Sequence, residues 1–301
     1  MKDIIKVSIL TCVLASHFLC VLSTGYAESN EFWRQWSDGK AEVNTYTLTQ
    51  PRYNENRVGQ LHLIYVTEPF SKSRHVKVDQ YHSKNIDHTI ALKLNIVESW
   101  RTGVYEYRVM TSQFYDAQDS LVPLKMTFSS QEWCGMSFEE IRWFDGVLKQ
   151  TSKSYFEGES TQNELSHNVR FLDQLLVIAR GLQVGGPQAV KYTSNHFIES
   201  AKHRFLSHLP LTSYDADLRL DPSQKINTEL GVLNAYRLSF KRANRSQCHL
   251  HIETAKPYRI LAWVCDDGEK AHITQSVRMP YWEYTRTQDD RALENFGRRK
   301  P

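Results

Sequence analysis

The sequence predicts a mainly β protein in which one large, curved antiparallel sheet forms a half-barrel or barrel-like shell, with one long amphipathic helix packed on it. Three observations carry this prediction. Most of the chain alternates apolar and polar residues with a period of two, which is typical of strands that have one face on a core. Turn signals separate these runs. One segment, residues 161–181, has helical spacing instead.

The strand pattern is clearest in three runs of the N-terminal half. They are "QLHLIYVTE" (60–68), "TIALKLNIVES" (89–99) and "GVYEYRVMT" (103–111), in which Tyr105 and Tyr107 share one face. Side chains of successive strand residues point to opposite faces, so each run has one apolar face for a core. We expect about ten strands, mostly paired with their neighbours in the sequence.

Two Asp-Gly pairs predict tight hairpins. Asp145–Gly146 lies between two apolar segments in "RWFDGVLKQ", and Asp267–Gly268 does so in "WVCDDGEKAHI". Such pairs favour hairpin turns because Gly and Asp tolerate the positive φ that these turns require.

The segment "TQNELSHNVRFLDQLLVIARGL" predicts the long helix. Its apolar residues recur at steps of three and four, which is the stripe of an amphipathic helix: Leu165, Val169, Leu172, Leu176 and Ala179. Thr161 and Glu164 have the spacing of a capping box, and Gly181 can end the helix in a left-handed conformation. We expect this helix to lie on the inner face of the sheet.

The two ends of the chain are expected to lie outside the fold. Residues 1–27 resemble a signal peptide, because a positive start is followed by an apolar stretch and by small residues at Gly25 and Ala27. After its removal no other run is apolar and long enough to cross a bilayer as a helix. We therefore expect an exported protein of the periplasm or extracellular space, with one β-rich domain over residues 28–290 and a frayed charged tail at 291–301.

Composition narrows the classes of partner. Apolar residues make up 41% of the chain and aromatic residues 12%, which is enough for a packed core and unlike a disordered chain. The formal net charge is only +3, and its basic residues are mixed with acids, so no nucleic-acid partner is expected. The sequence contains no Gly-rich phosphate loop, no G-x-S-x-G nucleophile elbow and no cysteine pairs with zinc-ribbon spacing. We expect no cofactor.

Three cysteines follow the signal segment, and two of them are placed to pair. If the chain turns between Lys256 and Pro257, Cys248 faces Cys265 directly across an antiparallel hairpin. Opposed Cβ atoms lie about 4.5–5.5 Å apart, close enough for a disulfide in an oxidising compartment. The alternative is two reduced, buried cysteines, since a shift of one residue in the turn would separate them.

Cys134, in "SSQEWCGMSF", is left without a partner and has two interpretations. The neighbouring Gln131 and Gly135 resemble the nucleophile segment of a cysteine hydrolase or transferase. A catalytic thiol is favoured by a helix N-terminus, however, and this segment indicates a strand, a break and a second strand. Ser137 and Glu140 have capping-box spacing, which keeps a short helix as the competing prediction. Cys134 as a buried core residue is the interpretation we prefer.

Two histidines form a weaker pattern. His249 and His251 lie on one face of the strand that carries Cys248, and such a pair could present two imidazoles to a metal ion. A catalytic zinc site needs three protein ligands, and the third is not evident. Outward-facing polar residues are the simpler interpretation, so no metal site is expected.

The functional prediction is a non-catalytic protein of the cell envelope. Curved sheets can enclose a lipid or another apolar or amphiphilic ligand, and Tyr105, Tyr107 and Trp263 are the candidate lining residues. The alternatives are the hydrolase or transferase that depends on Cys134, and a structural or protein-binding role marked by an exposed apolar patch.

Three segments of the chain also resemble a known group of proteins. They are "RVGQLHLIYVTEPFS", "YEYRVMTSQFY" and "SSQEWCG". Together they resemble a little-studied family of exported bacterial proteins that sometimes carries the label of Maf-type septum-formation inhibitor. The S-x-R-R signature of Maf pyrophosphatases has no counterpart here. The resemblance therefore implies an exported bacterial protein and assigns no catalytic residue.

Overall fold

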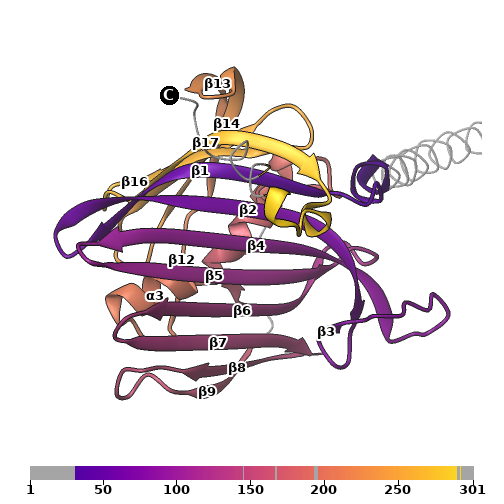
Figure 1. Ribbon diagram of the computed structural model, residues 1–301, viewed down its shortest axis with the longest axis horizontal. Coiled ribbons are helices and arrows are strands. Elements are labelled where there is room, and N and C mark those ends of the chain that lie inside the picture. The colour runs from indigo at the N-terminus through magenta and orange to yellow at the C-terminus, as the bar shows by residue number, and fades with distance from the viewer. Residues whose placement is uncertain (1–30, 145, 167, 193–195, 290–291, 293–301) are drawn as a thin grey trace, which may run out of the picture.

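A 14-stranded antiparallel sheet organises most of the chain (Figure 1). The computed structural model describes residues 31–144, 146–166, 168–192, 196–289 and 292. The strands are β1 (Ala41–Arg52), β2 (Glu55–Ser71), β3 (Val76–Lys77), β4 (His88–Thr102), β5 (Tyr105–Asp116), β6 (Val122–Glu132), β7 (Gly135–Phe144), β8 (Val147–Lys153), β9 (Gln162–Ser166), β13 (Arg219–Thr228), β14 (Gly231–Lys241), β15 (Gln247–Glu253), β16 (Ile260–Cys265) and β17 (Lys270–Met279).

The sheet is curved but open. Its order is β13-β14-β15-β16-β17-β1-β2-β4-β5-β6-β7-β8-β9, with β3 beside β2. The two outermost strands, β13 and β9, do not pair with each other, so the described strands do not close into a barrel. Most neighbours in this order are also neighbours in sequence, as the short turns between the runs predicted. The exceptions are β2 beside β4, with β3 between them in the chain, and β17 beside β1, which joins the two ends of the fold.

The inner face of the sheet is covered by one stretch of chain. We call residues 168–192 and 196–218 the covering segment. It contains β10 (Arg170–Phe171), η1 (Leu172–Gln174), α2 (Leu175–Ile178), η2 (Pro187–Tyr192), β11 (His196–Ile198), α3 (Ala201–Ser207) and β12 (Ser213–Asp215). Figure 1 shows it behind the strands. Outside it, residues 31–36 are helical, and η3 (Tyr281–Glu283) and η4 (Thr287–Asp289) follow the last strand.

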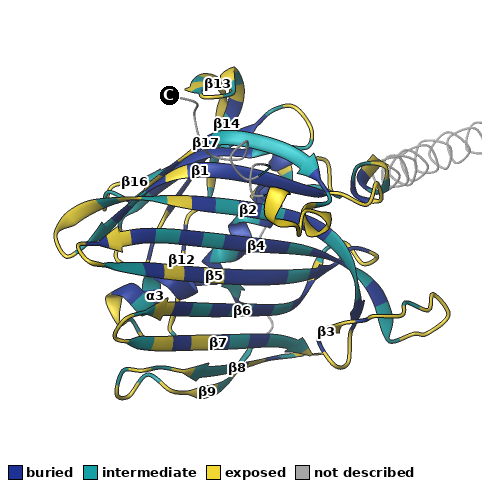
Figure 2. Ribbon diagram, viewed as in Figure 1, coloured by how far each residue is buried: buried dark blue, intermediate teal, exposed yellow. Residues whose placement is uncertain are grey.

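The main core lies between the sheet and the covering segment. Leu61, Leu63, Leu92 and Leu94 are fully buried there, and the less buried His62 and Lys93 lie between the members of each pair. Figure 2 shows buried and less buried parts following one another along the strands. Tyr65 donates its hydroxyl proton to the carbonyl of Leu176 at 2.9 Å, which fixes α2 against β2. The period-two pattern therefore predicted which side chains of the sheet face inward.

The predicted long helix over residues 161–181 is wrong. Residues 162–166 form β9, which pairs with β8 so that Leu165 lies opposite Leu148, and only the four residues of α2 are α-helical in this stretch. Pairing with β8 satisfies backbone groups that would otherwise form an open sheet edge, and this tertiary gain outweighs a weak local preference for helix. The longest helix in the described residues, α3, was not predicted.

Gly181, at the end of the stretch 161–181, adopts the left-handed conformation that the sequence predicted. Gly181 has a φ of +53°, and a Cβ atom at this position would lie 2.0 Å from the carbonyl oxygen of Gly186. The carbonyl of Gly181 also accepts a hydrogen bond from the Gly186 amide at 2.9 Å. The left-handed glycine thus closes a tight loop after α2.

The hairpin predictions agree with the topology. Gly268 has a φ of +97° in the turn that joins β16 to β17, and Gly146, with a φ of +80°, follows β7. Asp145 lies outside the described residues, as do the signal segment 1–27 and nearly all of the tail 291–301. In the part of the chain that is described, no helix is both long enough and apolar enough to cross a bilayer.

The predicted disulfide is confirmed. Cys248 lies opposite Cys265 in the pairing of β15 with β16, and Leu250 lies opposite Trp263. The register shifts by one residue between His251 and Ile252, which lie between the cysteines and the turn. The pairing of Cys248 with Cys265 therefore depends on this irregularity as well as on where the chain turns.

We predict that removal of this disulfide destabilises the fold. The bond closes a loop with a sequence separation of 17 residues, and a loop of about 15 residues contributes ~3 kcal/mol by restricting the unfolded chain. The double variant Cys248→Ala/Cys265→Ala should lose roughly this free energy of unfolding in a urea titration. Cys134→Ser is the matched control, and an equal loss in both proteins would contradict the prediction.

Candidate functional site

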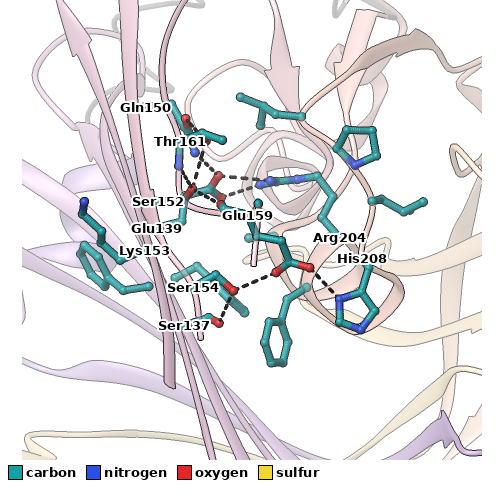
Figure 3. Close-up of a pocket in the computed structure, with 18 of the residues that line it drawn as sticks. Ser137, Glu139, Gln150, Ser152, Lys153, Ser154, Glu159, Thr161, Arg204 and His208 are labelled. Atoms are coloured by element: carbon teal, nitrogen blue, oxygen red, sulfur yellow. Dashed lines mark hydrogen bonds and ion pairs between the residues drawn. The ribbon is translucent and has the colours of Figure 1, made fainter. Parts of the chain in front are cut away.

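A cleft of about 500 Å³ lies between the β7–β8 end of the sheet and α3 (Figure 3). We call it the Arg204 cleft. Strands β6 to β9 and the loop after β8 supply one side, and α3 with residues 208–211 supplies the other. Its volume is in the range of about 300–1,000 Å³ that ligand pockets occupy.

The helix that carries Arg204 begins and ends at defined signals. Ser200 caps α3 by accepting a hydrogen bond from the His203 amide at 3.1 Å, and Asp173 accepts one from the Ala201 amide. The helix ends at His208, whose φ of +53° places it in the left-handed region, where His is enriched among non-glycine residues. Pro210 follows and prevents the helix from continuing. Arg204 and His208 consequently both face the cleft.

Arg204 forms a buried, two-pronged ion pair with Glu139 of β7. The two Arg204–Glu139 N–O distances are 3.1 and 2.5 Å, and both side chains are about nine-tenths buried or more. Gln150 of β8 donates a further hydrogen bond to Glu139 at 2.8 Å, and its own carbonyl accepts one from Asn163 at 2.8 Å. Such pairs hold a planar guanidinium in one orientation. The inner wall of the cleft is therefore rigid.

A second polar group surrounds Glu159 in the loop after β8. Its carboxylate lies 2.7 Å from His208 Nδ1 and accepts a hydrogen bond from the Ser154 hydroxyl at 2.8 Å. Ser154 also contacts Ser137 at 3.2 Å. Figure 3 shows Glu159 lying between Ser154 and His208. This loop is thereby attached to the end of α3 across the mouth of the cleft.

The order of these contacts differs from that of a hydrolytic triad. In a triad the hydroxyl contacts the imidazole, and the carboxylate holds the imidazole from the other side. Here the carboxylate of Glu159 stands between the hydroxyl and the imidazole, so His208 does not activate Ser154. Glu139 is engaged by Arg204 on both carboxylate oxygens.

Cys134 is exposed, so its predicted place in the core is wrong. The prediction that it lies between two strands is confirmed, because β6 ends at Glu132 and β7 starts at Gly135, with no helix at this point. A turn of only two residues at the end of a hairpin cannot be covered by the sheet. The Glu132 side chain accepts a hydrogen bond from the Cys134 amide at 2.9 Å, and its hydrogen bond and negative charge raise the pKa of the thiol.

The aromatic side chains predicted to line a ligand site do not line the Arg204 cleft. Tyr107 is buried and stacks on Trp100 with ring centroids 5.1 Å apart. Trp263 is buried too, and its indole N–H donates to Glu269 at 3.1 Å. Tyr105 is half-buried near Trp133. The first two belong to the core between the sheet and the covering segment.

The histidine pair of β15 has polar surroundings and no metal-binding geometry. His249 Nδ1 lies 2.9 Å from the Ser239 hydroxyl. Burial, together with the positive charge of nearby groups, lowers the pKa of His251. No group of three or more metal-ligating side chains is found among the residues that the structure describes.

Sequence reasoning missed the residues that build the cleft. Glu139 and Gln150 occupy inward-facing positions of β7 and β8, at which the alternation would place apolar residues. The sequence signal for the cleft was the charged Glu139 at a position of β7 whose side chain faces inward. The partner, Arg204, lies 65 residues further along the chain and could not be identified without the fold.

Comparisons with known proteins give little further information. No family model matches the chain, and no curated protein matches it. A crystal structure of a beta-barrel-like protein of domain of unknown function DUF1849 from Brucella abortus is similar, with a TM-score of 0.44 and 8% sequence identity, over 79% of this chain and 97% of that chain.

We predict that Arg204→Met destabilises the protein by roughly 3–5 kcal/mol, because it leaves the buried charge of Glu139 without a partner. The double variant Arg204→Met/Glu139→Leu should recover most of this loss. Urea unfolding measures both changes. Arg108→Met is the control, since the Arg108–Glu106 pair is exposed and should contribute at most about 1 kcal/mol. Equal losses at the two arginines would contradict the prediction.

We also predict slow alkylation of Cys134. Its exposure lets iodoacetamide reach it in the folded protein, but the raised pKa keeps the thiolate fraction low at pH 7. Mass spectrometry should show a labelling rate that increases with pH and is higher in Glu132→Gln. A rate at pH 7 well above that of free cysteine would instead indicate an activated nucleophile.

Proposed function

We propose that this is an exported cell-envelope protein that binds an amphiphilic molecule in the Arg204 cleft and catalyses no reaction on it. The observation that carries the proposal is the cleft itself, which has an apolar floor and a preorganised polar wall. Phe128, Phe205 and Leu211 supply the floor, and the Glu139–Arg204 pair supplies the wall. Pockets with this division of lining bind small molecules and orient them through a few polar groups.

The ligand is placed at the cleft because the inner face of the sheet is already filled. The covering segment packs there against the main core, and the core side chains, Tyr107 and Trp263 among them, are buried. A ligand on the inner face would have to displace this segment. The Arg204 cleft needs no such rearrangement, which favours it over the original expectation of a ligand on the curved inner face.

Export is supported by two independent features. Residues 1–27 have the three-part pattern of a signal peptide. Cys248 and Cys265 form a disulfide, and such bonds persist mainly in oxidising compartments such as the periplasm and the extracellular space. Both features fit a protein that works outside the cytoplasm.

Protein binding is the second candidate function. Trp133, in the turn between β6 and β7, is 75% exposed, and Met136, near the start of β7, is 59% exposed. Tyr155, in the loop after β8, is 60% exposed. Exposed aromatic residues are enriched at protein interfaces. A cysteine-dependent reaction has less support, because the pKa of the exposed Cys134 thiol is raised rather than lowered.

The proposal predicts a bound molecule in protein isolated from its own envelope without detergent stripping. Native mass spectrometry should show an extra mass that is lost on denaturation. Asn163→Trp, which places a large ring in the cleft, should abolish that mass. Glu164→Trp is the matched control, because Glu164 is the next residue of β9 and is not part of the cleft.

Three outcomes are informative. A mass that is present in wild type and in Glu164→Trp but absent in Asn163→Trp supports binding in the cleft. A mass retained equally by all three proteins would show that the ligand binds outside the Arg204 cleft. No extra mass in any of them overturns the ligand-binding proposal and favours the protein-binding role.

A further inference from the structure

The floor of the Arg204 cleft is part of a longer series of aromatic rings. Phe128 and Phe205 have ring centroids 5.9 Å apart, and Phe156 lies 6.2 Å from Phe205. Tyr155 follows at 5.3 Å from Phe156, and it packs over Gly135 at the surface. Flat apolar surfaces are therefore available both inside the cleft and beside it.

The wall of the cleft is rich in groups that both donate and accept hydrogen bonds. Four hydroxyls and two carboxamides line it: Ser137, Ser152, Ser154, Thr161, Gln150 and Asn163. A hydroxyl is one donor with two acceptor sites, and a carboxamide offers a donor and an acceptor side by side. These groups match a ligand whose own polar groups are hydroxyls and amides.

The charges of the inner wall are matched within the protein, and Lys153, which also borders the cleft, directs its side chain away from Arg204 and Glu159 (Figure 3). Arg204 is engaged by Glu139, and Glu159 by His208 and Ser154. A phosphate or carboxylate ligand would need a cation that is free to pair with it, and Arg204 is committed to Glu139. The hydroxyls and carboxamides of the wall hydrogen-bond one another and the carboxylates of Glu139 and Glu159. A ligand with several hydroxyls can extend this network, because each hydroxyl oxygen has two acceptor sites. Such a ligand therefore fits this lining better than an anion or a bare hydrocarbon chain.

We infer that the ligand is a neutral saccharide, bound with one face of a sugar ring on the aromatic floor and its hydroxyls on the polar wall. A pyranose ring has an apolar C–H face and hydroxyls around its edge, which corresponds to this division of the lining. The cleft is larger than one ring needs, and the aromatic series leads out of it to Tyr155. The ligand is thus a segment of a longer chain. This inference rests on the proposed binding function of the cleft.

The test is calorimetric titration of the full-length mature protein with three neutral tetrasaccharides, built from N-acetylglucosamine, β-linked glucose and α-linked glucose. We expect at least one of them to bind, and Phe205→Leu to weaken its binding about fivefold to tenfold by removing a ring contact. Phe114→Leu is the matched control, because Phe114 is also half-buried but lies outside the cleft. Its affinity should equal that of the wild type.

The outcomes separate this inference from the function on which it rests. Binding that is weakened by Phe205→Leu and abolished by Asn163→Trp supports both. Binding that is equally strong in Phe205→Leu and Phe114→Leu overturns the stacking geometry. No binding of any of the three tetrasaccharides, with a co-purified mass still lost in Asn163→Trp, overturns the saccharide class alone. If no tetrasaccharide binds and no co-purified mass is found, both the saccharide inference and the binding function are overturned.

Discussion

Three buried cations of the covering segment are each paired with a carboxylate from elsewhere in the fold, and the arrangement of the molecule depends on these pairs. Arg180 contacts Glu42 of β1, and Arg204 contacts Glu139 of β7. Lys202 contacts both Glu98 of β4 and Glu269, which lies just before β17. Charges buried in this way are tolerated only with close partners. The covering segment can therefore dock on the sheet in only one position.

This docking fills most of the open side of the sheet. The segment brings its own backbone into the curve, and the sheet satisfies part of it: Gln113 donates to the carbonyl of Asp173 at 2.9 Å, and Arg52 donates to that of Leu206 at 2.6 Å. Apolar side chains pack between the segment and the sheet. The Arg204 cleft is formed where the segment leaves the sheet, beside the end of α3. A second space of about 510 Å³ borders α3 at His203 and Leu206 and is lined by the β1–β2 turn.

The features that the sequence predicted are those that depend on short stretches of chain. Strand alternation follows from local periodicity, and the facing positions of Cys248 and Cys265 depend on one hairpin, whose one-residue register shift the sequence did not indicate. The helix over residues 161–181 failed because β8 offered its first residues a strand partner, and this could not be inferred from the segment alone. The cleft was missed for a similar reason. Its ion pair joins residues 65 positions apart, and only the fold brings them together.

The charges of α3 have a role that apolar residues could not fill. Buried ion pairs often contribute no more stability than well-packed apolar side chains of similar size. Apolar packing, however, would allow a short helix to settle in several rotations. Lys202 and Arg204 are two residues apart on α3, yet they reach carboxylates on different strands. A rotation of the helix would break both contacts together. The two pairs thus fix the direction of Phe205 and His208, and with it the shape of the cleft.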